Sequence, residues 1–205
     1  MTDWLGFLSQ FREVANKVFQ SLGECRPVLL QSATGVGTLS ALSALTQLLI
    51  DPFYRTIEGF CVLIEKDIMH FGHTFGTFTG KKITDKHSAT FLLFLDAVWQ
   101  LIQQFPRAFE FGEDLLLYLI DCVYSCQFGT FMYTCYKERR EYERQTASVW
   151  SYVIDCKAEF VNSLYVQLND YLPVQTQKEW LRIWSGYYLR HKCRFSLKAD
   201  KSIDN

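Results

Sequence analysis

Apolar residues recur every three or four positions over much of the chain, which is the pattern of amphipathic α-helices. The clearest run extends from Trp4 to Leu22, and Gly23 supplies a stop signal after it. Similar stretches predict helices at residues 39–50, 54–66, 90–104, 113–125, 145–160 and 177–191. Residues 71–86 lack this period and predict the longest loop. The chain is therefore expected to be largely helical.

One short segment departs from the helical period. Pro27 to Leu30 is a continuous apolar run before a polar loop with two glycines, from Gln31 to Thr38. A strand that is apolar on both faces belongs inside a sheet covered by helices. We therefore expect an α/β domain, predominantly helical in this span, with one buried strand whose neighbours are not evident in the sequence.

Composition narrows the functional classes. The 205 residues, 49% of them hydrophobic, suffice for one substantial core but not comfortably for two domains. A net charge of -1 argues against the basic footprint that nucleic-acid binding requires, so no nucleic-acid partner is expected. Seven cysteines, an odd number, are interpreted as buried thiols and not as a disulfide framework.

The N-terminal segment lacks the basic and apolar regions of a signal peptide, and no stretch reaches the ~18 uninterrupted apolar residues of a spanning helix. We expect a cytoplasmic protein, and leave open a peripheral position on endosomal membranes. Lys81, Lys82 and Lys86 form a small basic loop that could contact such an anionic surface, although a solvated loop is the favoured interpretation.

The loop from Gln31 to Thr38 is the candidate for chemistry, because a strand, a glycine-containing loop and a helix start commonly hold an anion. A P-loop is excluded, since no lysine lies between Gln31 and Leu49. A dinucleotide-binding turn matches weakly, since Ser40 occupies the position of its third glycine. The remaining class is the cysteine-dependent phosphatase, in which a thiolate attacks phosphorus and an arginine six positions later clamps the oxygens.

Motifs along the chain carry the comparison further. In order, they are residues 51–66 (DPFYRTIEGFCVLIEK), 71–75 (FGHTF), 91–100 (FLLFLDAVWQ), 104–111 (QFPRAFEF), 124–131 (YSCQFGTF), 148–151 (SVWS) and 184–190 (WSGYYLR). With them the chain resembles the myotubularin family of phosphoinositide phosphatases from about Trp4 to Arg190. The resemblance implies a cysteine-phosphatase-like fold of which this sequence is the C-terminal half, with residues 1–197 as a partial phosphatase domain and residues 198–205 as a polar tail.

Counted back from Asp51 without a gap, the family's signature His-Cys-Ser-Asp-Gly-Trp-Asp-Arg-Thr falls on residues 31–39 (QSATGVGTL). Ser32 then replaces the nucleophilic cysteine, Gly37 the acidic residue and Thr38 the clamping arginine, while Gly35 is retained. None of the chain's cysteines has an arginine six residues later. Each missing group acts in the transition state, so we expect no enzymatic activity.

The resemblance also directs the functional expectations. Inactive members of the family pair with active phosphatidylinositol 3-phosphate phosphatases, which implies an adaptor that forms a heteromer with such an enzyme. One alternative is a phosphoinositide-binding module with a weak anion site at Gly35 and Gly37. Thr74 and Phe78 occupy the family's ring-phosphate positions, which argues against it. Residual 3-phosphatase activity and a product without independent function remain further alternatives. Neither a cofactor nor a metal is expected.

Overall fold

The computed structural model describes residues 3–33, 37–71, 73, 75, 89–133 and 135–190. In these ranges the secondary structure is helical, and the elements follow in the order α1 (Trp4–Gly23), α2 (Thr38–Ile50), η1 (Pro52–Arg55), α3 (Ile57–Leu63), the π-helix η2 (Ile64–Met69), α5 (Thr90–Gln104), α6 (Glu113–Ser125), α7 (Gly129–Met132), α8 (Tyr136–Tyr142), η3 (Glu143–Gln145), α9 (Val149–Asp155), α10 (Lys157–Phe160), η4 (Lys178–Trp180) and α11 (Ser185–Tyr188).

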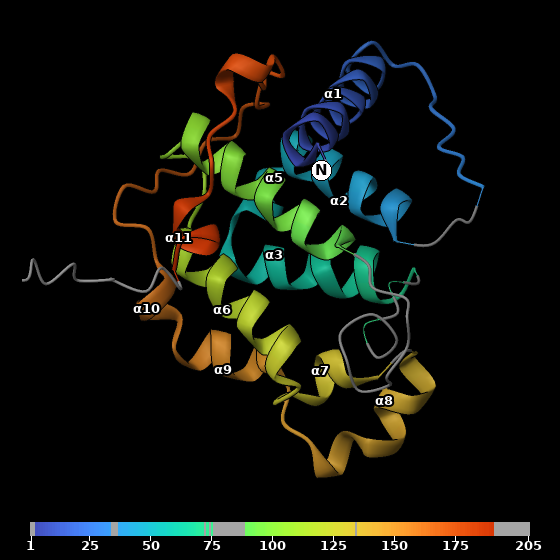
Figure 1. Ribbon diagram of the computed structural model, residues 1–205, viewed down its shortest axis with the longest axis vertical. Coiled ribbons are helices and arrows are strands. Elements are labelled where there is room, and N and C mark those ends of the chain that lie inside the picture. Colours follow the sequence, from blue (N-terminus) through green and yellow to red (C-terminus); the bar gives the residue numbers. More distant parts are fainter. Residues whose placement is uncertain are drawn as a thin grey trace, which may run out of the picture.

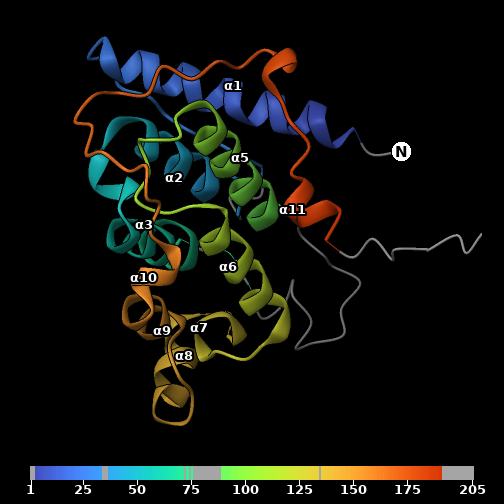
Figure 2. The same cartoon turned by 90° about the vertical axis from the view of Figure 1, so that its left-hand side faces the viewer.

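The helices are stacked from one end of the molecule to the other in an order that only partly follows the sequence (Figure 1). Helix α1 lies at the top, α2 and α5 beneath it, then α3 and α6, and α7, α8 and α9 form the opposite end (Figure 1). The perpendicular view shows the same succession (Figure 2). The loop before α2 and the α7–α8 region are therefore placed on different parts of the stack.

Local sequence signals explain where several helices begin. The Asp3 side chain accepts a hydrogen bond from Gly6 N at 2.8 Å and caps α1. The Asp51 carboxylate accepts one from Phe53 N at 2.9 Å, ahead of Pro52 in the first turn of η1. Helix α6 ends at Cys126, which has φ 52° and the left-handed conformation typical of a helix C-terminus.

Aromatic side chains form the centre of the core. The Phe60 ring stacks on Phe111 with 4.4 Å between centroids and lies 6.1 Å from Phe94, so α3, α5 and the turn before α6 meet there. Trp99 stacks on Trp184 at 5.9 Å between centroids, which attaches the end of the described chain to α5. Of the six aromatic residues at 91, 94, 99, 105, 109 and 111, five are buried and Phe105 is partly buried.

A long irregular segment returns from α10 toward α1 and is held by hydrogen bonds to side chains and backbone of other elements. Arg55 is central to it: the buried guanidinium donates to the carbonyls of Leu48, Leu49, Leu168 and Asp170 at 2.9 to 3.3 Å. Farther along, Gln104 and Gln100 of α5 exchange hydrogen bonds with the backbone of residues 175 and 182. The segment is thus fixed by bonds to other elements, and η4 is a single helical turn within it.

The predicted buried strand is wrong. Residues 27–30 form no strand, and Leu29 is 88% exposed. The apolar run indicated a buried strand, but burial in a sheet requires flanking strands, and the described residues contain only an isolated bridge between Phe111 and Val161. The α/β prediction therefore fails in its strand, while its predominantly helical part is confirmed.

Two predicted helices also need correction. The helix expected at residues 145–160 starts at Val149, because Ser148 caps it, and is interrupted at Cys156. The helix expected at residues 177–191 is replaced by two single turns, η4 and α11. Between the two turns, the backbone of Arg182 bonds to the side chain of Gln100 on α5 and not to a helical neighbour. Predictions at residues 90–104 and 113–125 match α5 and α6 at both ends.

Candidate functional site

The connection between α1 and α2 contains the positions that the sequence singled out. Ser32 is half-buried, Gly37 is buried and Thr38 is exposed at the first position of α2. Gly35 lies outside the described residues. The structure therefore places Ser32, Gly37 and Thr38 on the approach to α2, where the sequence predicted a loop leading into a helix.

Gly37 has an unusual backbone conformation at the start of α2. Its φ of 75° and ψ of -60° correspond to a strained turn that side chains disfavour. The carbonyl of Gly37 accepts hydrogen bonds from Ser40 Oγ at 2.7 Å and Ala41 N at 3.0 Å. No side chain caps α2, and its first turn has no acidic residue. The helix start thus retains the N-terminal partial positive charge that favours an anion.

His73 lies against this turn. A Cβ atom built on Gly37 would be 3.2 Å from His73 Nδ1. Only 2% of His73 is exposed, and its ring meets Phe75 edge-on at 4.4 Å between centroids. Burial lowers the pKa of His73 from its ordinary value of 6.5 to about 4. At neutral pH the imidazole is therefore uncharged and packs the loop against the core.

A groove of ≈ 540 Å³ opens beside the first turns of α2. It is lined by Leu30, Leu39, Ser40, Ser43, Gln47, Lys66, Asp67 and Phe71. Its apolar members are Leu30, Leu39 and Phe71, and Phe71 is 71% exposed. Leu30 and Leu39 flank the loop that the sequence predicted as the site, so the groove lies beside that loop.

A polar network forms one wall of the groove. The buried Asp67 carboxylate accepts a hydrogen bond from Ser43 Oγ at 2.9 Å and another from Gln47 Nε2. Lys66 Nζ donates to Gln47 Oε1 at 2.6 Å and to Tyr54 OH at 2.7 Å. Burial lowers the pKa of Lys66, but its contacts with Tyr54 and Asp67 outweigh this and raise it. The lysine is therefore charged and engaged by its neighbours.

The π-helix η2 brings Lys66 and Asp67 to the groove. Its wider turn extends from Ile64 to Met69. It places Lys66 within hydrogen-bonding distance of Gln47 on α2, and Asp67 within hydrogen-bonding distance of Ser43. Short π-helical turns are frequent at functional sites. Sequence analysis predicted a helix there but missed this cluster. The available signal was the pair Ser43 and Gln47, two polar residues four apart on the predominantly apolar α2.

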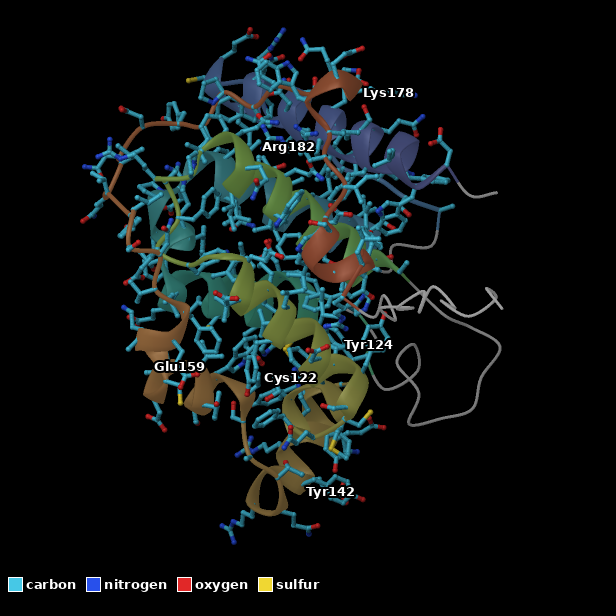
Figure 3. The ribbon with its side chains drawn as sticks, turned by 60° about the vertical axis from the view of Figure 1, so that its left-hand side comes forward. Cys122, Tyr124, Tyr142, Glu159, Lys178 and Arg182 are labelled. Carbon is cyan, nitrogen blue, oxygen red and sulfur yellow. The ribbon has the colours of Figure 1, made fainter. Side chains whose placement is uncertain are left out.

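Two of the described cysteines, Cys61 and Cys122, are buried. Burial raises the pKa of Cys61 to about 12 and that of Cys122 to about 11, which suppresses their thiolates. Cys122 lies on α6 (Figure 3). The prediction of buried thiols is confirmed for these two, whereas Cys25 and Cys135 are exposed and that part of it is wrong.

Other sequence predictions concern residues outside the described ranges. The altered ring-phosphate positions Thr74 and Phe78 belong here, as do the tail at 198–205 and the three lysines at 81, 82 and 86. Within the described ranges, no group of three or more potential metal ligands comes together. None of the helices described there is both long and apolar enough to cross a bilayer.

Comparison with known proteins adds an independent line of information. The profile of the myotubularin-like phosphatase domain matches residues 1–140. Myotubularin of Rattus norvegicus is 40% identical over 184 residues, which are 86% of this chain and 30% of the relative. Phosphatidylinositol-3,5-bisphosphate 3-phosphatase MTMR2 of Gallus gallus is 38% identical over 186 residues, 87% of this chain and 32% of the relative.

A third relative, phosphatidylinositol-3,5-bisphosphate 3-phosphatase mtm-1 of Caenorhabditis elegans, is 37% identical over 197 residues. These cover 91% of this chain and 34% of the relative. The chain thus spans about a third of the length of the curated relatives it matches. The sequence resemblance is confirmed at the level of the family.

Proposed function

This chain belongs to the myotubularin family of phosphoinositide phosphatases, and from that membership we propose that it is a catalytically inactive member that acts as an adaptor of an active phosphatase. The observation that carries the proposal is the loop before α2. There Ser32 and Thr38 stand six residues apart, where the family signature has its nucleophilic cysteine and its phosphate-clamping arginine.

The chemistry of the loop supports the loss of turnover. A serine hydroxyl needs an adjacent base to become a nucleophile, and a phosphoryl transition state needs cationic or N–H donors around its equatorial oxygens. Thr38 supplies no charge, and Gly37 has no side chain to protonate a leaving group. Lys66, the cation that lines the adjacent groove, is engaged by Gln47, Tyr54 and Asp67. Loss of several groups that act together removes nearly all activity.

The apolar surface beside the loop supports association with a protein. Val28 and Leu29 are exposed, and no backbone hydrogen bond formed by residues 28–30 is found within the described part of the chain. An extended segment with free N–H and C=O groups favours addition of a strand from another polypeptide. Leu30 of this segment and Phe71 both line the groove beside α2. Apolar side chains and open backbone groups therefore occur together there.

We propose an active myotubularin-family phosphatase as the partner, because the resemblance to inactive members of the family implies pairing with an active enzyme. The open segment at residues 28–30 is the surface that such a partner would contact. A cytoplasmic location, with peripheral recruitment to endosomal membranes through that partner, follows as part of this proposal.

A weak phosphoinositide site is the second candidate function. It is favoured by the start of α2 at Gly37. No side chain caps this helix, and its first turn has no acidic side chain that would repel an anion. The neutral loop gives this site only the helix dipole and N–H groups for affinity, so we expect weak binding compared with an active relative.

Catalysis is tested by phosphate release from phosphatidylinositol 3-phosphate and phosphatidylinositol 3,5-bisphosphate with the purified 205-residue chain. We expect release at the level of the buffer, unchanged in Ser32→Ala. Release that the wild-type chain shows and Ser32→Ala loses would refute the inactive assignment. Flotation with vesicles that contain or lack the 3-phosphorylated lipid tests the second candidate, and equal flotation of both would reject it.

Association is tested by co-expression with an active myotubularin phosphatase and measurement of the complex by size-exclusion chromatography. Leu29→Asp should weaken the complex at least about tenfold, because a charge replaces an exposed apolar contact in the open segment. Leu164→Asp is the matched control, since Leu164 is 59% exposed in the irregular segment after α10. An equal effect of both substitutions would place the interface elsewhere.

A further inference from the structure

A second cavity lies between the π-helix η2 and the α7–α9 region, at the end of the stack away from α1 (Figure 1). Its volume is ≈ 180 Å³. The polar groups that line it include Glu65, Thr130, Arg139, Arg140, Ser148 and Trp150. None of the lining residues belongs to the loop before α2, so this cavity is separate from the candidate site described above.

Arg139 is the most unusual of these groups. Its side chain is 12% exposed, and Nη1 lies 3.4 Å from Glu65 Oε1. Nε and Nη2 are buried without a hydrogen-bond partner. A guanidinium has five N–H donors, and burial of an unsatisfied donor costs ~1–3 kcal/mol, more for a charged group. The cavity lining therefore contains a buried guanidinium whose donors are only partly satisfied.

Neighbouring groups extend this donor set. Arg140 adds a second guanidinium. Ser148 Oγ accepts from Trp150 N at 3.3 Å and is 3.5 Å from Thr130 Oγ1, so its own proton is available to an incoming acceptor. The Thr130 hydroxyl is already occupied as an acceptor from Val149 N at 3.0 Å. Two arginines and one serine hydroxyl can thus donate into one cavity.

Glu65 is the one carboxylate in this wall, and it is already occupied. Its Oε2 accepts from Trp150 Nε1 at 2.8 Å, and its Oε1 pairs with Arg139 Nη1. Two arginines against one carboxylate leave a net charge of +1 in the lining. A second carboxylate would have cancelled this charge, so the balance favours an anionic ligand over a neutral one.

We propose that this cavity binds a phosphate group, or a comparable tetrahedral oxyanion, through Arg139, Arg140 and Ser148. An oxyanion accepts several hydrogen bonds at once and compensates the guanidinium charge, which matches the unsatisfied Nε and Nη2 of Arg139. The phosphate can belong to a soluble ion or to a lipid headgroup, since both present the same oxygens. The site does not depend on the inactivity of the loop before α2.

The test is a titration of the 205-residue chain with inorganic phosphate at constant ionic strength, followed through the indole N–H signal of Trp150 in a proton–nitrogen NMR spectrum. That N–H donates to Glu65 in the cavity wall, so occupancy should shift it. We expect a saturable shift, and dissociation constants at least about tenfold higher in Arg139→Gln and Arg140→Gln. Chloride at equal ionic strength should not reproduce it.

Lys137→Gln is the matched control, because it removes one positive charge from α8 outside the cavity lining. It should leave the dissociation constant within about twofold. If Arg139→Gln unfolds the chain, the comparison of Arg140→Gln with Lys137→Gln still decides, since both side chains are exposed. No saturable shift, or equal weakening in all variants, would overturn the proposal.

Two further arms distinguish the sources of the phosphate. Soluble inositol 3-phosphate and vesicles containing phosphatidylinositol 3-phosphate are compared with inorganic phosphate and with vesicles lacking the phosphorylated lipid. Binding that Arg140→Gln weakens in the soluble arms alone identifies a soluble ligand. Weakening in the vesicle arm as well identifies a lipid headgroup. Soluble and vesicle binding that Arg140→Gln leaves unchanged would contradict the site.

Discussion

His73 and Gly37 are in such close contact that any side chain at position 37 would meet the imidazole, with 3.2 Å between His73 Nδ1 and a Cβ placed on the glycine. The contact joins the loop before α2 to the aromatic core, because His73 also packs on Phe75. In the family signature this position is acidic. The turn seen here therefore leaves little space for an acidic side chain at position 37 unless His73 moves.

Substitution of Gly37 should destabilise the chain. Gly37→Ala and Gly37→Asp should lower the free energy of unfolding by about 1–3 kcal/mol, because φ 75° with ψ -60° is strained for any side chain and His73 blocks relaxation. Urea unfolding measures the change. Gly23→Ala is the control, since nothing lies within 4 Å of its added Cβ at the end of α1. A neutral Gly37→Ala would show that the turn adapts.

Acid should destabilise the protein through His73. Its folded pKa of about 4 lies below the ordinary 6.5, so stability is fully present above about pH 6.5 and is lost as pH falls toward about 4. The shift corresponds to about 3 kcal/mol over this range. Unfolding of wild type and His73→Phe between pH 7 and 4 measures it as the difference between their slopes.

The control for this prediction is His70→Gln, which removes a histidine whose side chain is 45% exposed. The control should keep the wild-type slope, because the buried imidazole is still present. Parallel profiles of wild type and His73→Phe would refute the assignment to His73, since the carboxylates contribute equally to both.

Replacement of Arg55 should be among the most destabilising conservative changes. Arg55→Lys should cost about 2 kcal/mol or more, because one ammonium cannot reach the four carbonyls that the planar guanidinium serves on two separate segments. Urea unfolding is again the measurement. Arg26→Lys should stay within about 0.5 kcal/mol, since that side chain is 66% exposed. Equal effects of the two would mean that the segment after α10 contributes little.

Asp96 should be essential for attachment of α1 and α11 to α5. Its carboxylate accepts from Trp4 Nε1 at 2.9 Å, Gln100 Nε2 at 3.1 Å and Tyr188 OH at 2.8 Å. Removal of the buried acceptor in Asp96→Ala also leaves the charge of buried Arg12 uncompensated. We expect a loss of about 3–5 kcal/mol in thermal or urea unfolding.

Asp121→Ala is the comparison for Asp96→Ala. Asp121 pairs with Arg190 at 2.7 Å but is 59% exposed, so its loss should cost about 1 kcal/mol or less. A small effect of Asp96→Ala, similar to that of Asp121→Ala, would contradict the role of Asp96 as the common acceptor.

Much of the helical framework could be predicted from the sequence. Residues 90–104 and 113–125 were bounded correctly, because apolar periodicity, Pro106 and the acidic start of α6 are local signals. The motifs from residue 51 onward identified the family, because they are long and ordered. The predicted strand failed because the local composition favoured a strand, whereas the tertiary structure provided no neighbouring strand among the residues that it describes. Residues 27–30 have the composition of a buried strand, but a strand requires partners that no local pattern can supply.

In the candidate site, too, local sequence and distant contacts each decided a different part. The sequence by itself predicts, through the family resemblance and a gap-free count from Asp51, that Ser32, Gly37 and Thr38 stand at the positions of the family's catalytic loop. Only the tertiary structure decided that His73 fills the space beside Gly37, that Asp67 meets Ser43, and that Arg139 pairs with Glu65 in a cavity lining. These contacts join residues 24 to 74 positions apart. Their geometry arises from packing between helices, which periodicity does not encode.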